Sequence, residues 1–288
     1  MAVVISWLGA AVAAVAYGSA SVIQATAAGR ARRSQHLDAM LLVRLLGQLP
    51  YVAGLGLDLL GFVATVAALR TLPLFVVQPA IASSVGVTAF VASRVLGTRL
   101  GRRDLAALAG LVVGMALLAI SARPKPAVTP SNVRQWILVA GVGVALGLGV
   151  AGARLRTRVS AVVLALAAGL SWAGTGIAAR VLVVPRPLWH LLTEPVAWAV
   201  VLYGLLGTLL FATALQRGSV TAVAAIVFVV ETVVAAIVGL TLLGDRSRPH
   251  QGGVALAGII VTVLATIVLA RFAEVTPQGE ASPASGTR

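Results

Sequence analysis

Nine apolar stretches divide this chain, and the short polar segments between them hold most of its charges. Most of the stretches approach the ~20 residues that a helix needs to cross the ~30 Å hydrocarbon core of a bilayer. Helices of a soluble domain alternate apolar and polar faces, whereas these stretches are apolar almost throughout. The pattern predicts an all-α polytopic membrane protein with spans at residues 3–27, 51–69, 73–93, 104–122, 135–152, 159–183, 195–215, 219–242 and 251–270.

One segment leaves a second count of spans open. Residues 37–48 are apolar but short, and Arg44 interrupts them. Taken as an interfacial helix, this segment gives nine spans with the N-terminus outside. Taken as an extra span that ends at Pro50, it gives ten spans with the N-terminus inside. The ten-span arrangement places three arginines of residues 30–33 outside, so we favour nine.

Basic residues predict the orientation. With nine spans, 14 of the 22 basic residues fall on the cytoplasmic side, where membrane proteins concentrate them. We therefore expect a multi-pass protein of the plasma (inner) membrane with a cytoplasmic C-terminus. The first stretch lacks a basic segment before it and is too long for a cleaved signal, so we expect a retained helix. Residues 272–288 are predicted to be a disordered tail.

Composition narrows the classes of function. Only 10% of the residues are charged, and the formal net charge of +14 is spread through the loops. That distribution is typical of contact with membrane lipid, not of nucleic-acid binding. The chain has no cysteine, its three histidines have no ligand spacing, and no nucleophile–base pair is visible. We expect no enzyme, no cofactor and no metal site, and leave open whether the protein is a monomer or a homodimer.

The chain carries an internal repeat. At an offset of 147 residues, Ala67–Arg99 aligns without a gap with Ala214–Arg246, and Arg70 matches Arg217. The predicted topology places Arg70 outside and Arg217 inside, so the two halves run in opposite directions through the membrane. Residues 1–122 form the first predicted repeat and residues 123–271 the second. Inverted repeats are the design of alternating-access carriers, which hold their substrate near the midplane.

These features resemble the drug/metabolite transporter superfamily, and within it the EamA-like branch. Leu96-Gly97-Thr98-Arg99 and Leu243-Gly244-Asp245-Arg246 stand where many members read Leu-Gly-Glu-Arg. The stretch from Gly61 through Leu72-Pro73-Leu74 to Val77-Gln78-Pro79 is similar to the NIPA-type magnesium transporters. Phe62 stands where the NIPA pattern has glutamate. The resemblance implies a transporter built from two inverted repeats, and its NIPA-like part implies a divalent cation as one substrate.

Two acids inside predicted spans are the first candidates for a substrate site. An ionised carboxylate in hydrocarbon is costly, so Asp58 and Glu231 are expected to face a cavity. Glu231 lies near the middle of its span, and Thr232 follows it. At the repeat offset Glu231 corresponds to Ser84, so the same depth of the other half is also polar. Asp58 is expected nearer the cytoplasmic third of its helix.

Other polar side chains share helix faces with these acids. Tyr17, Ser21 and Gln24 are spaced by four and three residues on the first span, as one face requires. Proline at 79 removes a backbone donor and frees a carbonyl near residue 75, which predicts broken helix geometry there. The expected substrate-binding residues are Tyr17, Gln24, Asp58, Gln78, Ser83, Ser84, Trp172, Thr175, Glu231 and Thr232.

The sequence thus favours a secondary transporter that moves a small polar solute or ion across the plasma membrane by alternating access. One alternative is a NIPA-type transporter of Mg²⁺ or another divalent cation, although buried oxygen anions are scarce in the spans and Mg²⁺ is normally held through one or two carboxylates plus waters. The other is a membrane accessory or scaffold subunit that transports nothing, for which Glu231 would be dispensable.

The topology has a direct test, because the chain contains no cysteine of its own. We predict that Thr98→Cys reacts with a membrane-impermeant thiol reagent only from the cytoplasm, and Ser247→Cys only from outside. Labelling of both cysteines from one side would contradict the inverted repeat.

Overall fold

A computed structural model describes residues 1–30, 47–95, 100–126, 132–155, 157–185 and 187–270. Within these ranges the chain is helical, with a single isolated β-bridge between Ala122 and Ser247. The helices are α1 (Ala2–Arg30), α3 (Leu49–Ala68), α4 (Leu74–Ala82), α5 (Ser84–Val95), α6 (Arg102–Ser121), α7 (Asn132–Ala153), α8 (Thr157–Val181), the short 3₁₀ helix η1 (Leu188–Thr193), α9 (Pro195–Leu215), α10 (Val220–Thr241) and α11 (Gly252–Leu269).

The all-helical class and the nine apolar stretches are confirmed in the described part of the chain, where nine segments are long and apolar enough to cross a membrane. Eight of them are single helices, and the third consists of α4 and α5 together. The break between these two helices lies at Ser83, not near residue 75 as the sequence analysis expected. Pro79 instead lies inside α4, and its backbone carbonyl accepts a hydrogen bond from the Ser83 N–H at 2.9 Å.

The outer surface of the described helices is apolar. Large aliphatic side chains point outward from several helices; Val112 is 70% exposed and Leu209 is 63% exposed. A water-soluble protein rarely exposes so much contiguous apolar surface, whereas lipid tails accept it. Together with the helix lengths, this surface supports a membrane-spanning protein.

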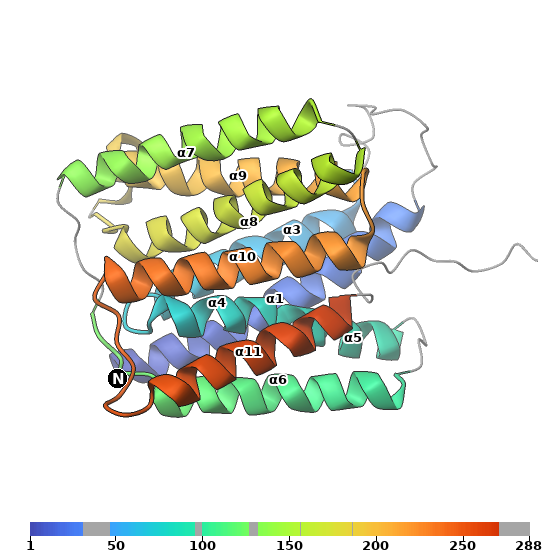
Figure 1. Ribbon diagram of the computed structural model, residues 1–288, viewed down its shortest axis with the longest axis horizontal. Coiled ribbons are helices and arrows are strands. Elements are labelled where there is room, and N and C mark those ends of the chain that lie inside the picture. Colours follow the sequence, from blue (N-terminus) through green and yellow to red (C-terminus); the bar gives the residue numbers. More distant parts are fainter. Residues whose placement is uncertain (31–46, 96–99, 127–131, 156, 186, 271–288) are drawn as a thin grey trace, which may run out of the picture.

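The helices lie roughly side by side and run back and forth along one axis (Figure 1). α1 and α3 are antiparallel, because Ser6 Oγ donates to the Ala67 carbonyl while Gln24 bonds to Asp58 farther along. The two helices that flank residues 31–46 therefore meet at the same end of the molecule, as nine spans require. Most of the segment 37–48 lies outside the described residues, as do the tail 272–288 and the loop 96–99.

Small residues let α6 and α11 pack backbone to backbone. A Cβ built on Gly114 of α6 would lie 2.9 Å from the Thr262 nitrogen of α11 and 3.1 Å from the Gly258 carbonyl oxygen. Gly258 in turn leaves no room for a Cβ, which would lie 3.0 Å from the Gly114 carbonyl oxygen. This contact joins the last helix of each half, and close approach through small residues is a common way for membrane helices to associate.

We predict that Gly114→Ala destabilises the protein, because the new methyl group forces the α6 and α11 backbones apart. Overpacking of this kind costs about 1–3 kcal/mol. Gly143→Ala is the matched control, since a Cβ at Gly143 of α7 meets nothing within 4 Å. Thermal unfolding in detergent should show a lower midpoint for Gly114→Ala and an equal or higher one for Gly143→Ala. Equal midpoints for the two variants would show that the glycine contact is unimportant.

Candidate functional site

A cavity of about 700 Å³ lies between the helices of the two halves. Its wall comes from α1, α3, α4, α5, α8, α9 and α10. The lining residues are Tyr17, Ser21, Val22, Gln24, Asp58, Phe62, Thr65, Gln78, Ile81, Ala82, Ser84, Val85, Thr88, Trp172, Thr175, Gly176, Ala179, Gly204, Leu205, Thr208, Phe211, Phe228 and Glu231. This size falls within the range of small-molecule sites.

Eight of the ten residues predicted from the sequence line this cavity: Tyr17, Gln24, Asp58, Gln78, Ser84, Trp172, Thr175 and Glu231. The other two lie outside it. The Ser83 hydroxyl donates to the Ala80 carbonyl at 2.6 Å and so supports the break between α4 and α5. Thr232 is buried one residue beyond Glu231, which turns it about 100° around the helix.

The large polar and aromatic side chains of the cavity lie over glycines of neighbouring helices. A Cβ on Gly61 would approach the Tyr17 ring to 3.0 Å, one on Gly54 would lie 2.5 Å from Gln24, and one on Gly207 would lie 2.3 Å from the Trp172 ring. Gln78 crosses directly over Gly176, where a Cβ would overlap its amide nitrogen. Glycine at these positions therefore makes room for the side chains that form the cavity wall.

The two acids of the cavity have different surroundings. A carboxylate oxygen of Asp58 accepts a hydrogen bond from the side-chain amide of Gln24 at 2.6 Å. Asp58 lies near the middle of α3, whereas the sequence analysis expected it nearer the cytoplasmic third of the helix. Glu231 is at the middle of α10, only 8% exposed, and has no hydrogen-bond partner among the described residues. Because an unpaired buried carboxylate is unfavourable, Glu231 is the group of this cavity that most needs a ligand or a proton.

The sequence analysis missed the contribution of α9. Gly204, Thr208 and Phe211 line the cavity and are spaced by four and three residues. That spacing places them on one helix face, and it was visible in the sequence. The ring of Phe211 packs against Trp172 with centroids 5.1 Å apart, so two helices of the second half share an aromatic wall.

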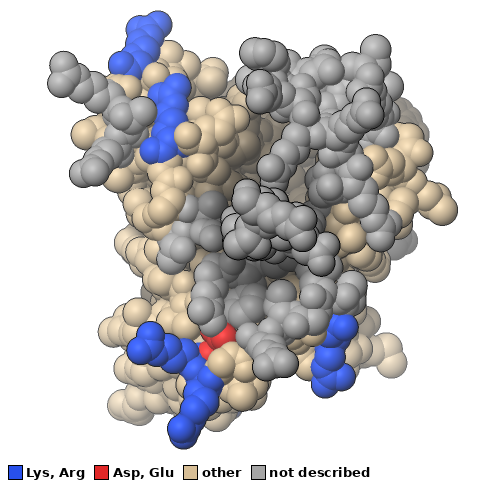
Figure 2. Space-filling model, turned by 90° about the vertical axis from the view of Figure 1, so that its right-hand side faces the viewer, with Lys and Arg blue, Asp and Glu red and all other residues tan. Residues whose placement is uncertain are grey.

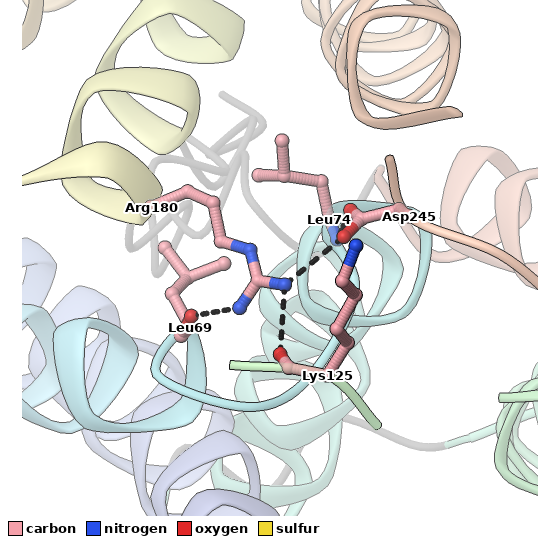
Figure 3. A network of polar contacts seen from close by, with 5 residues as sticks. All are labelled: Leu69, Leu74, Lys125, Arg180 and Asp245. Atoms are coloured by element: carbon pink, nitrogen blue, oxygen red, sulfur yellow. Dashed lines mark hydrogen bonds and ion pairs between the residues drawn. The ribbon is translucent and has the colours of Figure 1, made fainter. Parts of the chain in front are cut away.

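A second polar cluster closes the bundle at the end where α3, α6, α8 and α10 finish (Figure 3). Its centre is a buried ion pair of 3.0 Å between Arg180 of α8 and Asp245 of the α10–α11 loop. Arg180 also donates to the carbonyls of Leu69 and Lys125, and Asp245 accepts the N–H of Leu74 at 2.8 Å. We call this end of the molecule the Arg180 end. The sequence analysis placed Arg180 inside the predicted span 159–183 and Asp245 in a loop, and predicted neither role.

Arginines at the Arg180 end bind the C-terminal carbonyls of neighbouring helices. Arg180 at the end of α8 binds the Leu69 carbonyl at the end of α3, and Arg70, just after α3, donates to Ala179 and Leu182 at the end of α8. Arg248 does the same for the Ala122 carbonyl after α6. The last carbonyls of a helix lack partners and carry partial negative charge, so a cation stabilises them.

Burial dominates the electrostatics of this cluster. It raises the pKa of the Asp245 carboxyl above its usual value, although the Arg180 charge and the Leu74 N–H both act to lower it. Burial also lowers the pKa of Arg70, and the charge of Arg180 adds to that effect. Desolvation thus opposes the charged form of Asp245 more strongly than its partners favour it, and loss of one partner would leave the other charge in a costly position.

The opposite end of the molecule is organised differently. Basic side chains stand at several places around its rim (Figure 2), and the exposed ones among the described residues include Arg94, Arg102, Arg103 and Arg154. Arg217 donates here to the Ala153 carbonyl at the end of α7 and to Ser160 at 2.5 Å. Most of these arginines are exposed, whereas Arg180 at the other end belongs to a buried network of polar contacts.

The cavity is closed toward the Arg180 end. Three lining residues near that end, Thr65, Gln78 and Ala179, are at most 5% exposed. Ser21 and Thr208, by contrast, line the cavity in the other half of their helices and are exposed. Among the described residues, the wall of the cavity is therefore more exposed away from the Arg180 end.

We predict that Asp245→Asn lowers the stability of the protein, because it keeps the shape of the side chain but leaves the buried charge of Arg180 unpaired. Breaking one side of a buried pair costs about 3–5 kcal/mol. The neighbouring exposed Arg246→Gln is the control, and the double variant Arg180→Met/Asp245→Asn should recover part of the loss. Thermal unfolding in detergent measures all three. A single variant as stable as the control would show that the ion pair does not hold the helices together.

Comparison with known proteins gives one similar sequence, an uncharacterized protein of Corynebacterium glutamicum. The two chains are 25% identical over 226 residues, which cover 76% of this chain and 78% of the relative. No model of a known protein family matches the chain. No solved structure matches it either.

Proposed function

We propose that this protein is a secondary transporter of the drug/metabolite type, which moves a small polar solute or ion across the plasma membrane by alternating access. The observation that carries the proposal is the central cavity, which holds a buried carboxylate without a hydrogen-bond partner among the described residues and is closed by buried side chains toward the Arg180 end. An alternating-access carrier needs a substrate site near the membrane midplane that is closed first toward one face of the membrane and then toward the other. The Arg180 end is then the outer face, and the C-terminus of the chain is cytoplasmic.

The packing of the helices supports an inverted repeat. α1 packs against α3 and α5, and α8 packs in the same way against α9 and α10. α1 begins at the Arg180 end whereas α8 finishes there, so the corresponding helices run in opposite directions. Tyr17 over Gly61 in the first half corresponds to Trp172 over Gly207 in the second.

The same symmetry relates residues of the cavity. Ser84 and Glu231, which the repeat offset aligns, both line it, although one belongs to α5 and the other to α10. A site built at the interface of two halves is what alternating access by rocking of those halves requires.

The closure at the outer face suits a gate. The Arg180–Asp245 pair links α8 to the α10–α11 loop, and the same two side chains bind the end of α3 and the start of α4. The ion pair itself lies within the second half, but the bonds from Arg180 to Leu69 and from Leu74 to Asp245 join the two halves, so they can be exchanged for water when the halves separate. An apolar plug of the same size would lose much more free energy on opening, because its surface would be exposed to water.

We predict that the purified protein, reconstituted in proteoliposomes, moves at least one solute of a panel of metabolites and divalent cations. Glu231→Gln keeps the volume of the side chain and removes its charge, so it should insert and fold normally but lose solute-driven proton movement. Asp58→Asn should do less, because Gln24 already stabilises that carboxylate. Glu194→Gln, at the start of α9 and outside the cavity, is the matched control.

The outcomes separate the competing functions. Flux of Mg²⁺ with no response to organic solutes would favour the divalent-cation transporter. Wild-type, pH-dependent flux in Glu231→Gln would show that the glutamate only packs. No flux of any solute would favour an accessory or scaffold subunit.

A further inference from the structure

The cavity presents hydrogen-bond acceptors that lack donors. Glu231 has no hydrogen-bond partner among the described residues although it is only 8% exposed, and the Oε1 atom of Gln78 is buried without a partner in a residue that is 2% exposed. Both residues line the cavity. A buried acceptor without a donor costs about 1–3 kcal/mol, and more when it is charged. These two groups therefore favour a ligand that donates hydrogen bonds.

The hydroxyl groups of the wall strengthen this polarity. Each of four hydroxyls donates its proton to a backbone carbonyl of its own helix, and the oxygen lone pairs remain for a ligand: these are Ser21, Thr88, Thr175 and Thr208. The amide of Gln24 is likewise occupied by Asp58. What these groups offer to the cavity is accepting oxygen.

The charges of the cavity have one sign. Asp58 and Glu231 are its two ionisable carboxyl groups, and no lysine, arginine or histidine of the described chain lines it. An anion would meet no counter-charge in this wall and would lie beside two carboxylates. A cation would supply the charge and the donors that Glu231 lacks.

Aromatic rings occupy much of the remaining wall. Tyr17, Phe62, Trp172, Phe211 and Phe228 all line the cavity, and the Trp172–Phe211 pair forms a continuous aromatic surface. The face of an aromatic ring attracts a cation, and rings also accept the apolar body of a ligand. A hydrated metal ion uses neither property, and no group of three or more histidine, cysteine or acidic side chains that could hold a metal occurs in the part of the chain that the structure describes.

We propose that the ligand of this cavity is an organic monocation with an ammonium or guanidinium group and an apolar or aromatic body. Its charged group binds the carboxylate of Glu231 and the Oε1 atom of Gln78, and its body packs against Trp172 and Phe211. The inference rests on the proposed transport function for its biological meaning, but binding to the cavity is measurable without transport.

Three small molecules of one shape test the charge requirement. Phenethylamine is a cation at neutral pH, 2-phenylethanol is its neutral analogue, and 3-phenylpropionate is an anion of similar size. Binding of each to the full-length protein in detergent is measured by calorimetry. We expect phenethylamine to bind about 10- to 100-fold more tightly than 2-phenylethanol, as a charged hydrogen bond of about 1.5–3 kcal/mol requires, and 3-phenylpropionate not to bind.

Variants locate the binding. Glu231→Gln should weaken phenethylamine binding about tenfold or more and leave 2-phenylethanol binding nearly unchanged, whereas the control Glu194→Gln changes neither. Phe211→Leu should weaken the binding of both compounds several-fold, because both place a ring against the aromatic wall. This second variant keeps the test valid if Glu231→Gln does not fold.

Equal affinity for the amine and the alcohol, binding of the anion, or amine binding that survives both variants would each overturn the proposal. The result also separates it from the transport proposal. Amine binding with no flux in proteoliposomes would support the cation site and contradict a transporter. Flux of an anionic or neutral solute, unaffected by phenethylamine, would support a transporter and contradict the cation site.

Discussion

The buried contact between Arg180 and Asp245 is the constraint on which the arrangement of the described helices depends most. Four helices finish at that end, and each leaves carbonyls without partners at the edge of an apolar bundle. Arg70, Arg180 and Arg248 supply donors to three of those ends, and Asp245 balances the buried guanidinium of Arg180. The arginines at this end therefore serve as helix caps.

This closure decides the shape of the cavity. The halves are held together at the Arg180 end, where Gln78 is packed over Gly176, and diverge enough farther along to leave a space of about 700 Å³. The unpaired carboxylate of Glu231 lies within that space, beside aromatic side chains that themselves depend on glycines of the facing helices. The Arg180–Asp245 cluster and the cavity around Glu231 are therefore connected through α4, α8 and α10. A substitution in one of them is expected to change the structure of the other.

The membrane spans and the two acids of the cavity could be predicted from the sequence. The Arg180–Asp245 pair and the helix break at Ser83 could not, for physical reasons. Apolar length alone predicted nine spans, because hydrocarbon thickness fixes how long a crossing helix must be. The cost of a carboxylate in lipid identified Glu231 and Asp58 as cavity residues. Arg180 and Asp245 are 65 residues apart in the chain, and neither has a local pattern that marks the other as a partner. The position of the break at Ser83 was not predicted, because loss of the Pro79 N–H does not by itself determine where the helix ends.

The most direct test of an alternating cavity is the side from which it can be reached. Thr175 lines the cavity, and the protein has no cysteine, so Thr175→Cys can be labelled with a membrane-impermeant maleimide applied to either face of sealed vesicles. Ser247→Cys identifies the face at the Arg180 end. The account predicts that Thr175→Cys reacts only from the opposite face, and also from the Arg180 face once Arg180→Met/Asp245→Asn removes the closure. Reaction from the Arg180 face in the intact protein, or no new reaction after the closure is removed, would contradict it.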